Sequence, residues 1–125
     1  MKKIILVFIL LLVVGCGEKK SENSIVPPEI TASEVNEMIT NSDDFILLDV
    51  RTKAEYDSAH IKGAVNIPLD ELESATTLDK SAKIVVYCQS GNRSLMAAKK
   101  LIENGYLEVY DLGGIIEWTY EMESN

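Results

Sequence analysis

Short apolar runs alternate with polar segments along most of the chain, and two of these runs predict buried strands. Residues 45–50, FILLDV, are apolar apart from Asp49, and residues 83–87, KIVVY, are mostly apolar and β-branched. Strands covered on both faces of a sheet show this continuous pattern. We therefore expect 45–50 to be a central strand. Two shorter strands are predicted at 64–67 and 108–112.

Helical spacing appears between these runs. Thr31 and Glu34 have the spacing of a capping box, and apolar residues follow them on one helical face. Residues 94–103 also have their apolar side chains at helical spacing, and Gly105 is placed to end that helix. Further short helices are predicted at 53–58, 69–73 and 115–121. Strands alternating with helices predict one α/β domain, with a small and mostly parallel sheet flanked by helices.

The N-terminal stretch MKKIILVFILLLVVGC has a different pattern. Two lysines precede an apolar run of 11 residues, which is followed by Gly15 and Cys16. This is the layout of a secretory signal. The run is shorter than the roughly 17 to 25 residues of a spanning helix, and a buried core element is the alternative interpretation. The end of the run resembles a bacterial lipoprotein signal, which implies cleavage before Cys16 and lipidation of Cys16.

These patterns divide the chain into a signal peptide (1–15), a lipidated cysteine with a flexible polar tether (16–28), and a folded domain (29–125). The lipid would anchor the domain to a membrane outside the cytoplasm. Gly17 stands where an Asp would resemble an inner-membrane retention signal, so we expect the outer membrane in a host that has one. The chain has a net charge of −8 at pH 7, which argues against nucleic acid as a partner.

Cys88 stands between the strand at 83–87 and the helix at 94–103, and it is the main candidate for chemistry. The chain has two cysteines, so lipidation of Cys16 would leave Cys88 without a disulfide partner. A small buried side chain is the alternative to a functional thiol. The loop after Cys88 is polar, however, and the N–H groups at a helix start favour a thiolate, which is the nucleophilic form. Gly91 lets the backbone close around the sulfur.

Four segments, in this order, resemble the rhodanese (thiosulfate sulfurtransferase) family. They are Leu48 to Arg51 with Glu55 and Tyr56, His60 to Pro68, Cys88 to Ser94, and Leu112 to Gly114 with Trp118. The resemblance implies a three-layer domain in which Cys88 carries a sulfane sulfur as a persulfide. It implies transfer from a small donor, thiosulfate or a persulfide, to a thiol or cyanide, with no metal or cofactor. It also implies that the donor is bound by the loop residues Gln89, Ser90, Gly91, Asn92, Arg93 and Ser94.

The length of this loop separates sulfur transfer from phosphatase chemistry. Cysteine phosphatases use a Cys-x5-Arg loop, whereas Arg93 stands five positions after Cys88, and position 94 is Ser. The shorter loop resembles the sulfur-transferring branch. Gln89, Ser90 and Asn92 carry no charge, whereas thiosulfate-preferring relatives often have cationic loop side chains. We therefore expect thiosulfate to be a poor donor.

Several polar residues near the loop have two possible roles. Arg93 could guide an anionic donor or pair with a carboxylate inside the fold, and both roles stay open. Asp49 and Arg51 follow a strand end and could touch a substrate, but we interpret them as structural, with Arg51 pairing to Glu55 or another acid. His60 is also interpreted as structural, because a thiolate needs no general base.

The competing hypothesis for the whole protein is a non-catalytic rhodanese-like module. Such a module would bind a partner or only carry sulfur. A Cys88 loop that keeps Gly91 and Arg93 favours catalysis, because a binding module needs no such loop around a thiolate.

Overall fold

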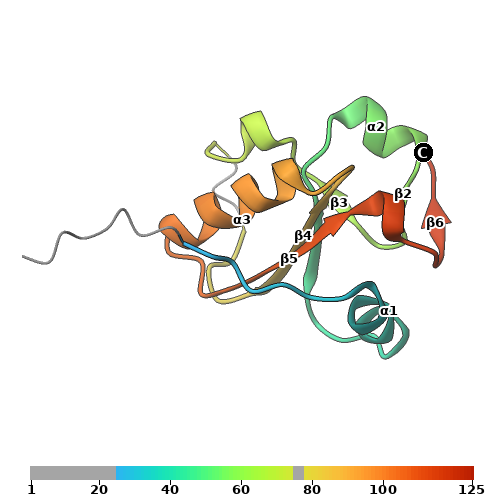
Figure 1. The fold of residues 1–125 in the computed structure, drawn as a ribbon, viewed down its shortest axis with the longest axis horizontal. Helices are drawn as coiled ribbons and strands as arrows, with labels where there is room; N and C mark the ends of the chain where they lie inside the picture. The colour runs from blue at the N-terminus through green and yellow to red at the C-terminus, as the bar shows by residue number, and fades with distance from the viewer. Residues whose placement is uncertain (1–24, 75–77) are drawn as a thin grey trace, which may run out of the picture.

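The computed structural model describes residues 25–74 and 78–125, and its centre is a parallel sheet in the order β3-β1-β4-β5 (Figure 1). The strands are β1 (Ile46–Asp49), β3 (Val65–Asn66), β4 (Lys83–Cys88) and β5 (Glu108–Gly114). β1 pairs with both β3 and β4, and β4 pairs with β5, all in parallel. The carboxyl ends of the strands therefore meet at one edge of the sheet.

Helices cover both faces of this sheet. The helices are α1 (Ala32–Thr40), α2 (Lys53–Ser58) and α3 (Asn92–Glu103), with 3-10 turns η1 (Leu69–Glu71) and η2 (Ile115–Glu117). Residues of α3 pack with one set of strand side chains, and residues of α1 pack with the other set. Figure 1 shows α1 and α3 on opposite sides of the strands. The domain is thus the three-layer α/β fold that the sequence predicted.

Side chains of β4 alternate between these two cores. Ile84, Val86 and Cys88 belong to the core beneath α3, whereas Val85 and Tyr87 belong to the core beneath α1. All five residues are 0% exposed. Burial on both faces removes the need for polar positions, which explains the continuous apolar run in the sequence.

The helix ends follow the predicted signals. Thr31 Oγ1 accepts the Glu34 N–H at 3.1 Å, and Glu34 Oε2 accepts the Thr31 N–H at 3.2 Å, which forms the capping box of α1. Gly105 follows α3 with φ +90°, a left-handed conformation that suits glycine. α3 begins at Asn92, two residues earlier than predicted, because Gly91 at φ +107° turns the chain directly into the helix.

The predicted helix at 115–121 is wrong. Only η2 is helical there, and the chain then extends into β6 (Met122–Glu123), which pairs antiparallel with β2 (His60–Ile61). Trp118 already has extended backbone angles, and its indole N–H donates to the Glu121 carbonyl at 3.3 Å. Pairing with β2 therefore replaces helical hydrogen bonding in this segment.

The N-terminal predictions lie mostly outside the described residues. The signal peptide, Cys16 and the first part of the tether fall within residues 1–24, which the structure does not describe. At the end of the predicted tether, the Pro28 carbonyl accepts the Asp111 N–H at 2.9 Å, and the Ile30 N–H donates to the Asp111 carbonyl at 3.1 Å. Residues 28–30 therefore run along the edge of β5.

Within residues 25–74 and 78–125, no helix has the length and apolar character needed to cross a membrane.

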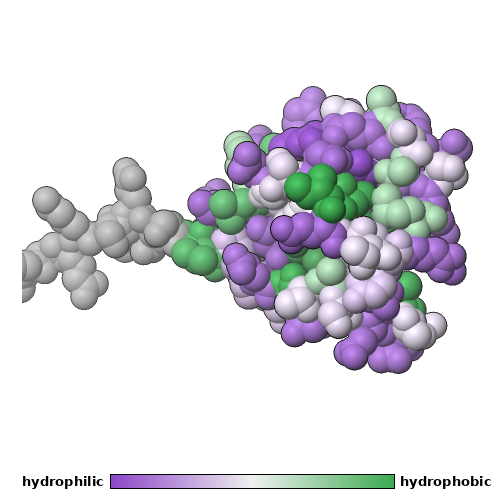
Figure 2. All heavy atoms as spheres, turned by 45° about the vertical axis from the view of Figure 1, so that its right-hand side comes forward, coloured by the Kyte–Doolittle hydropathy of each residue, from purple (hydrophilic) through white to green (hydrophobic). Residues whose placement is uncertain are grey.

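Polar residues cover most of the surface seen in Figure 2, with a small hydrophobic area near its middle. The most exposed large apolar residues of the described chain are Leu107, at 81%, and Val26, at 80%.

Candidate active site around Cys88

Cys88 is the last residue of β4, at the carboxyl edge of the sheet. Its side chain is buried in the core beneath α3, and the Gly91 N–H donates to Cys88 Sγ at 3.0 Å. The sequence left open a buried thiol or a thiol that faces backbone donors, and the structure shows both: Cys88 is buried, and the Gly91 N–H points at its sulfur. A donor in this position stabilises negative charge on sulfur.

The loop is held in shape from within. Gly91 has φ +107°, which is a conformation that other residues rarely adopt. The Ser94 hydroxyl donates to the Gly91 carbonyl at 3.0 Å, and the Leu95 N–H donates to the same carbonyl at 3.2 Å. Because α3 starts at Asn92, the free N–H groups of its first turn lie directly after the sulfur.

The two glycines that end β5 form a wall behind the loop. A Cβ atom on Gly114 would stand 2.7 Å from the Gln89 carbonyl oxygen and 3.1 Å from Ser90 backbone atoms. The Ile116 N–H also donates to the Gln89 carbonyl at 3.4 Å. Gly114 therefore permits the close approach of the loop.

Replacing Gly114 with alanine should displace the loop. Its φ of −92° and ψ of 133° suit alanine, so the effect comes only from the new Cβ contact. We expect a loss of about 1–3 kcal/mol in the free energy of unfolding, as for other overpacked sites, and a changed rate of Cys88 alkylation. Denaturant melts and alkylation kinetics measure both.

Gly63→Ala is the matched control, because Gly63 has φ +84° but an added Cβ would meet no atom within 4 Å. It should cost about 1–2 kcal/mol through backbone strain and leave the alkylation rate of Cys88 unchanged. If Cys88 in Gly114→Ala were alkylated at the wild-type rate, the idea that Gly114 sets the position of the loop would be contradicted.

Arg93 pairs with a carboxylate. Its Nη1 and Nη2 donate to Glu55 Oε1 and Oε2 at 2.7 and 3.0 Å, a two-pronged contact between the starts of α3 and α2. The hydrogen bond from Arg93 lowers the pKa of Glu55 to about 2. Of the two roles open from the sequence, the structure shows the carboxylate pairing.

Arg51 and Asp49 form a second, more deeply buried pair. Arg51 Nη2 donates to Asp49 Oδ2 at 2.7 Å, and Arg51 Nη1 donates to the side-chain oxygen of Gln89 at 3.3 Å. The carboxylate that pairs with Arg51 is therefore Asp49, whereas Glu55 pairs with Arg93. The Nη1 contact links the side chain of Gln89 to Arg51.

His60 has structural contacts. Its ring stacks on Tyr56 with centroids 3.9 Å apart, and Nδ1 lies 2.8 Å from the Tyr56 carbonyl. Its Nε2 lies 3.7 Å from a carboxylate oxygen of Glu123 in β6. These contacts link α2, β2 and β6, and none of the contacts described for His60 involves the loop from Cys88 to Ser94.

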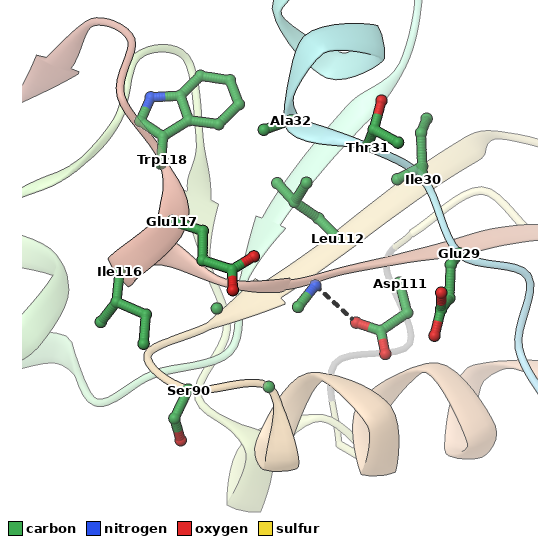
Figure 3. Close-up of a pocket in the computed structure, with 13 residues that line it drawn as sticks. Glu29, Ile30, Thr31, Ala32, Ser90, Asp111, Leu112, Ile116, Glu117 and Trp118 are labelled. Atoms are coloured by element: carbon green, nitrogen blue, oxygen red, sulfur yellow. Dashed lines mark hydrogen bonds between the residues drawn. The ribbon is translucent and has the colours of Figure 1, made fainter.

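A groove beside the loop was not predicted. It has a volume of about 440 Å³, lies along the carboxyl end of β5, and includes Ser90 and Gly91 in its wall (Figure 3). Three acidic side chains also line it: Glu29, Asp111 and Glu117. No sequence motif marks these acids, because they come from three separate segments. In residues 25–74 and 78–125, no group of three or more His, Cys, Asp or Glu side chains is placed to hold a metal ion.

Comparison with known proteins identifies the family. Residues 31–121 match the model of the Rhodanese-like domain. The chain belongs to the rhodanese family. This confirms the resemblance drawn from its motifs.

Related rhodanese proteins include sulfurtransferases and a sulfur carrier. The putative sulfur carrier protein YrkF of Bacillus subtilis is 38% identical over 109 residues, covering 86% of this chain and 59% of YrkF. A protein of Allochromatium vinosum named Sulfurtransferase is 34% identical over 92 residues, covering 72% of this chain and 86% of that protein. The chain spans smaller shares of other, longer relatives.

Solved structures show the same fold. The human single-domain sulfurtransferase TSTD1 superimposes with a TM-score of 0.66 at 28% identity, covering 73% of this chain and 94% of that structure. The chain is thus a rhodanese-like domain with sulfurtransferase and sulfur-carrier homologues.

Proposed function

We propose that this rhodanese domain is a sulfurtransferase that moves a sulfane sulfur through a persulfide on Cys88. The observation that carries the proposal is the 3.0 Å contact between the Gly91 N–H and Cys88 Sγ, within a loop that leads into α3. Donors aimed at the sulfur stabilise both the attacking thiolate and the anion of the persulfide.

The two half-reactions need no metal and no net redox partner. The Cys88 thiolate attacks the sulfane sulfur of a donor, the bond between that sulfur and the donor breaks, and the donor leaves with the electron pair. A donor persulfide thus leaves as a thiolate, and thiosulfate leaves as sulfite. A nucleophilic acceptor, a thiol or cyanide, then attacks the outer sulfur, and the electron pair returns to Cys88.

The charges around the loop support a persulfide rather than thiosulfate as the better donor. Arg93 is engaged by Glu55, and Arg51 is engaged by Asp49. Each arginine would have to break its ion pair with a carboxylate before it could bind the thiosulfate dianion. We therefore expect a persulfide or polysulfide to load the protein faster than thiosulfate does.

A sulfur carrier is the second candidate, and the similarity to YrkF favours it. A carrier would accept one sulfur and hold it until a specific partner took it. Intact mass after incubation with a sulfane donor should show the gain of one sulfur atom, and cyanide should remove it as thiocyanate. Many turnovers with donor and cyanide both present support the enzyme, whereas a single loading without turnover supports the carrier.

For the N-terminal region, we propose lipidation of Cys16, which would anchor the domain to a membrane on its extracytoplasmic side. The proposal rests on the apolar run that ends at Gly15 and Cys16. Cys16→Ser should remain uncleaved and should lose the lipid, as mass spectrometry and detergent partition would show. A Cys16→Ser protein that still matures and partitions like the wild type would contradict the lipoprotein interpretation.

A further inference from the structure

Arg51 is a buried residue, and one nitrogen of its guanidinium reaches the loop that follows Cys88. The residue is 4% exposed. Its Nε donates to both carboxylate oxygens of Asp49, at 3.1 and 3.0 Å. Its Nη2 donates to Asp49 Oδ2 at 2.7 Å and to the Ala59 carbonyl at 2.6 Å. These contacts fix the plane of the guanidinium, and the remaining nitrogen, Nη1, donates to Gln89 Oε1 at 3.3 Å.

Gln89 supplies the acceptor that this buried nitrogen needs. A buried charged donor that has no acceptor destabilises a fold strongly. Within residues 25–74 and 78–125, no buried side-chain nitrogen or oxygen lacks a hydrogen-bond partner. The hydrogen bond from Arg51 to Gln89 therefore joins a rigid ion pair in the domain interior to the first residue after Cys88.

This contact lies on the face of the sheet opposite to the sulfur. Cys88 belongs to the core beneath α3, whereas the preceding Tyr87 belongs to the core beneath α1. Side chains alternate along an extended chain, and Gln89 follows this alternation because it meets Arg51, whose Cζ lies 5.8 Å from the centroid of the Tyr87 ring. An effect of Arg51 on the sulfur therefore passes through the backbone of the loop.

The backbone path from Gln89 to the sulfur is short. Only Ser90 separates Gln89 from Gly91, whose N–H donates to Cys88 Sγ at 3.0 Å. The Gln89 carbonyl also accepts the Ile116 N–H at 3.4 Å, so Gln89 is held by its side chain and by its main chain. A shift of Gln89 would move the Gly91 N–H relative to Sγ.

We infer that Arg51 and Gln89 are positioning residues, which hold the start of the loop so that the Gly91 N–H points at Cys88 Sγ. The inference rests on the proposed function for its effect on sulfur transfer, because this N–H would stabilise negative charge on the thiolate and on the persulfide. A misplacement of about 1 Å can lower a rate by about a hundredfold. The position of the N–H itself can be measured without any sulfur donor.

The test is Gln89→Met, which keeps the length of the side chain and removes the acceptor oxygen. We expect the amide proton resonance of Gly91 to move upfield in a ¹H–¹⁵N NMR spectrum of the reduced full chain, because its hydrogen bond to sulfur is weakened. Sulfur transfer from a polysulfide to cyanide should fall roughly tenfold. This loss is smaller than the roughly hundredfold or larger loss that follows outright removal of an oxyanion donor.

Two variants serve as controls. Gln89→Glu keeps an oxygen that accepts from Arg51, so it should hold the Gly91 resonance near its wild-type position and recover most of the transfer rate. Tyr106→Phe removes another partly buried hydrogen bond of 3.3 Å, to the Leu78 carbonyl, and should change neither readout. A Gly91 resonance that moves equally in Gln89→Met and Tyr106→Phe would show a general loosening of the fold and overturn the inference.

Arg51→Lys tests the other partner of the contact. Lysine keeps a positive charge for Asp49 but lacks the planar fork that also reaches Gln89. The double variant Arg51→Lys/Gln89→Met should transfer sulfur no more slowly than Arg51→Lys alone, because both changes remove the same contact. Losses that multiply in the double variant would contradict the inference. If Arg51→Lys does not fold, as judged by circular dichroism, the two Gln89 variants decide alone.

The two readouts separate this inference from the proposed function. A Gly91 resonance that stays at its wild-type position in Gln89→Met would overturn the inference, whatever the transfer rate. If Gln89 bound the donor directly, Gln89→Met would lower the transfer rate without moving that resonance. A wild-type protein that no sulfane donor loads would refute the proposed function, and the Gly91 resonance would still decide whether Arg51 and Gln89 position the loop.

Discussion

Cys88→Ser should lose sulfur loading and cyanide-dependent turnover down to the uncatalysed background. A serine hydroxyl cannot hold a sulfane sulfur, and at neutral pH it does not ionise to a nucleophile as a thiol does. The change is nearly isosteric, and the Gly91 N–H that faces Sγ would remain in place. Intact mass before and after incubation with a polysulfide, and thiocyanate release with cyanide, measure the two steps.

Two controls make the result decisive. A buried hydroxyl without a good partner costs about 1–3 kcal/mol, so Cys88→Ala is tested in parallel, with circular dichroism to verify folding of both variants. Peptide mapping then locates any sulfur that the wild type gains. Loading of either folded variant at another residue, at the wild-type rate, would contradict a persulfide on Cys88.

Glu55→Gln should loosen the loop and reduce sulfur transfer from every donor. Glutamine can still complete the capping box with Thr52, which Glu55 forms at the start of α2, so mainly the ion pair with Arg93 is lost. The side chains of Arg93 and Glu55 are 34% and 33% exposed, and solvent screening limits the loss in unfolding free energy to about 1 kcal/mol. We expect persulfide loading to fall, and thiosulfate loading to fall by a smaller factor, because Arg93 released from the carboxylate can then attract the dianion.

The alternative outcome is informative. If Arg93 steered anionic donors, freeing it from Glu55 would improve loading from thiosulfate and leave persulfide loading unchanged, and Arg93→Ala would weaken thiosulfate loading alone. Glu34→Gln is the matched control for Glu55→Gln, because Glu34 occupies the same capping-box position in α1. It should leave transfer rates unchanged with either donor.

The same pair predicts a pH dependence of stability. Arg93 lowers the pKa of Glu55 from 4.5 to about 2 on folding. A carboxyl with a lower pKa in the folded state stabilises that state above pH 4.5, and this contribution is lost as the pH falls from 4.5 to about 2. The difference in unfolding free energy between the wild type and Glu55→Gln should therefore shrink over this range. A constant difference would mean that Glu55 is not charged in the pair.

The sequence by itself determined the fold class, two buried strands and the position of the candidate nucleophile at a strand end. Strands at the centre of a parallel sheet must be apolar on both faces, so β1 and β4 were visible as continuous runs. The capping box of α1 was visible for a similar reason, because Thr31 and Glu34 lie within one helical turn. The position of Cys88 at the end of β4 and shortly before α3 was predictable because the strand, the loop and the helix are contiguous in sequence.

Only the tertiary structure decided which distant groups meet. β2 and β6 have two residues each, too few to show a period, and their pairing overrode the helical pattern at 115–121. Arg93 and Glu55 are 38 positions apart, so no local spacing could favour Glu55 over another acid as the partner of Arg93. The acidic groove likewise forms where three separate segments converge. Ion pairs and cavities depend on how helices and strands pack against one another. The periodicity of apolar residues along the chain does not specify that packing.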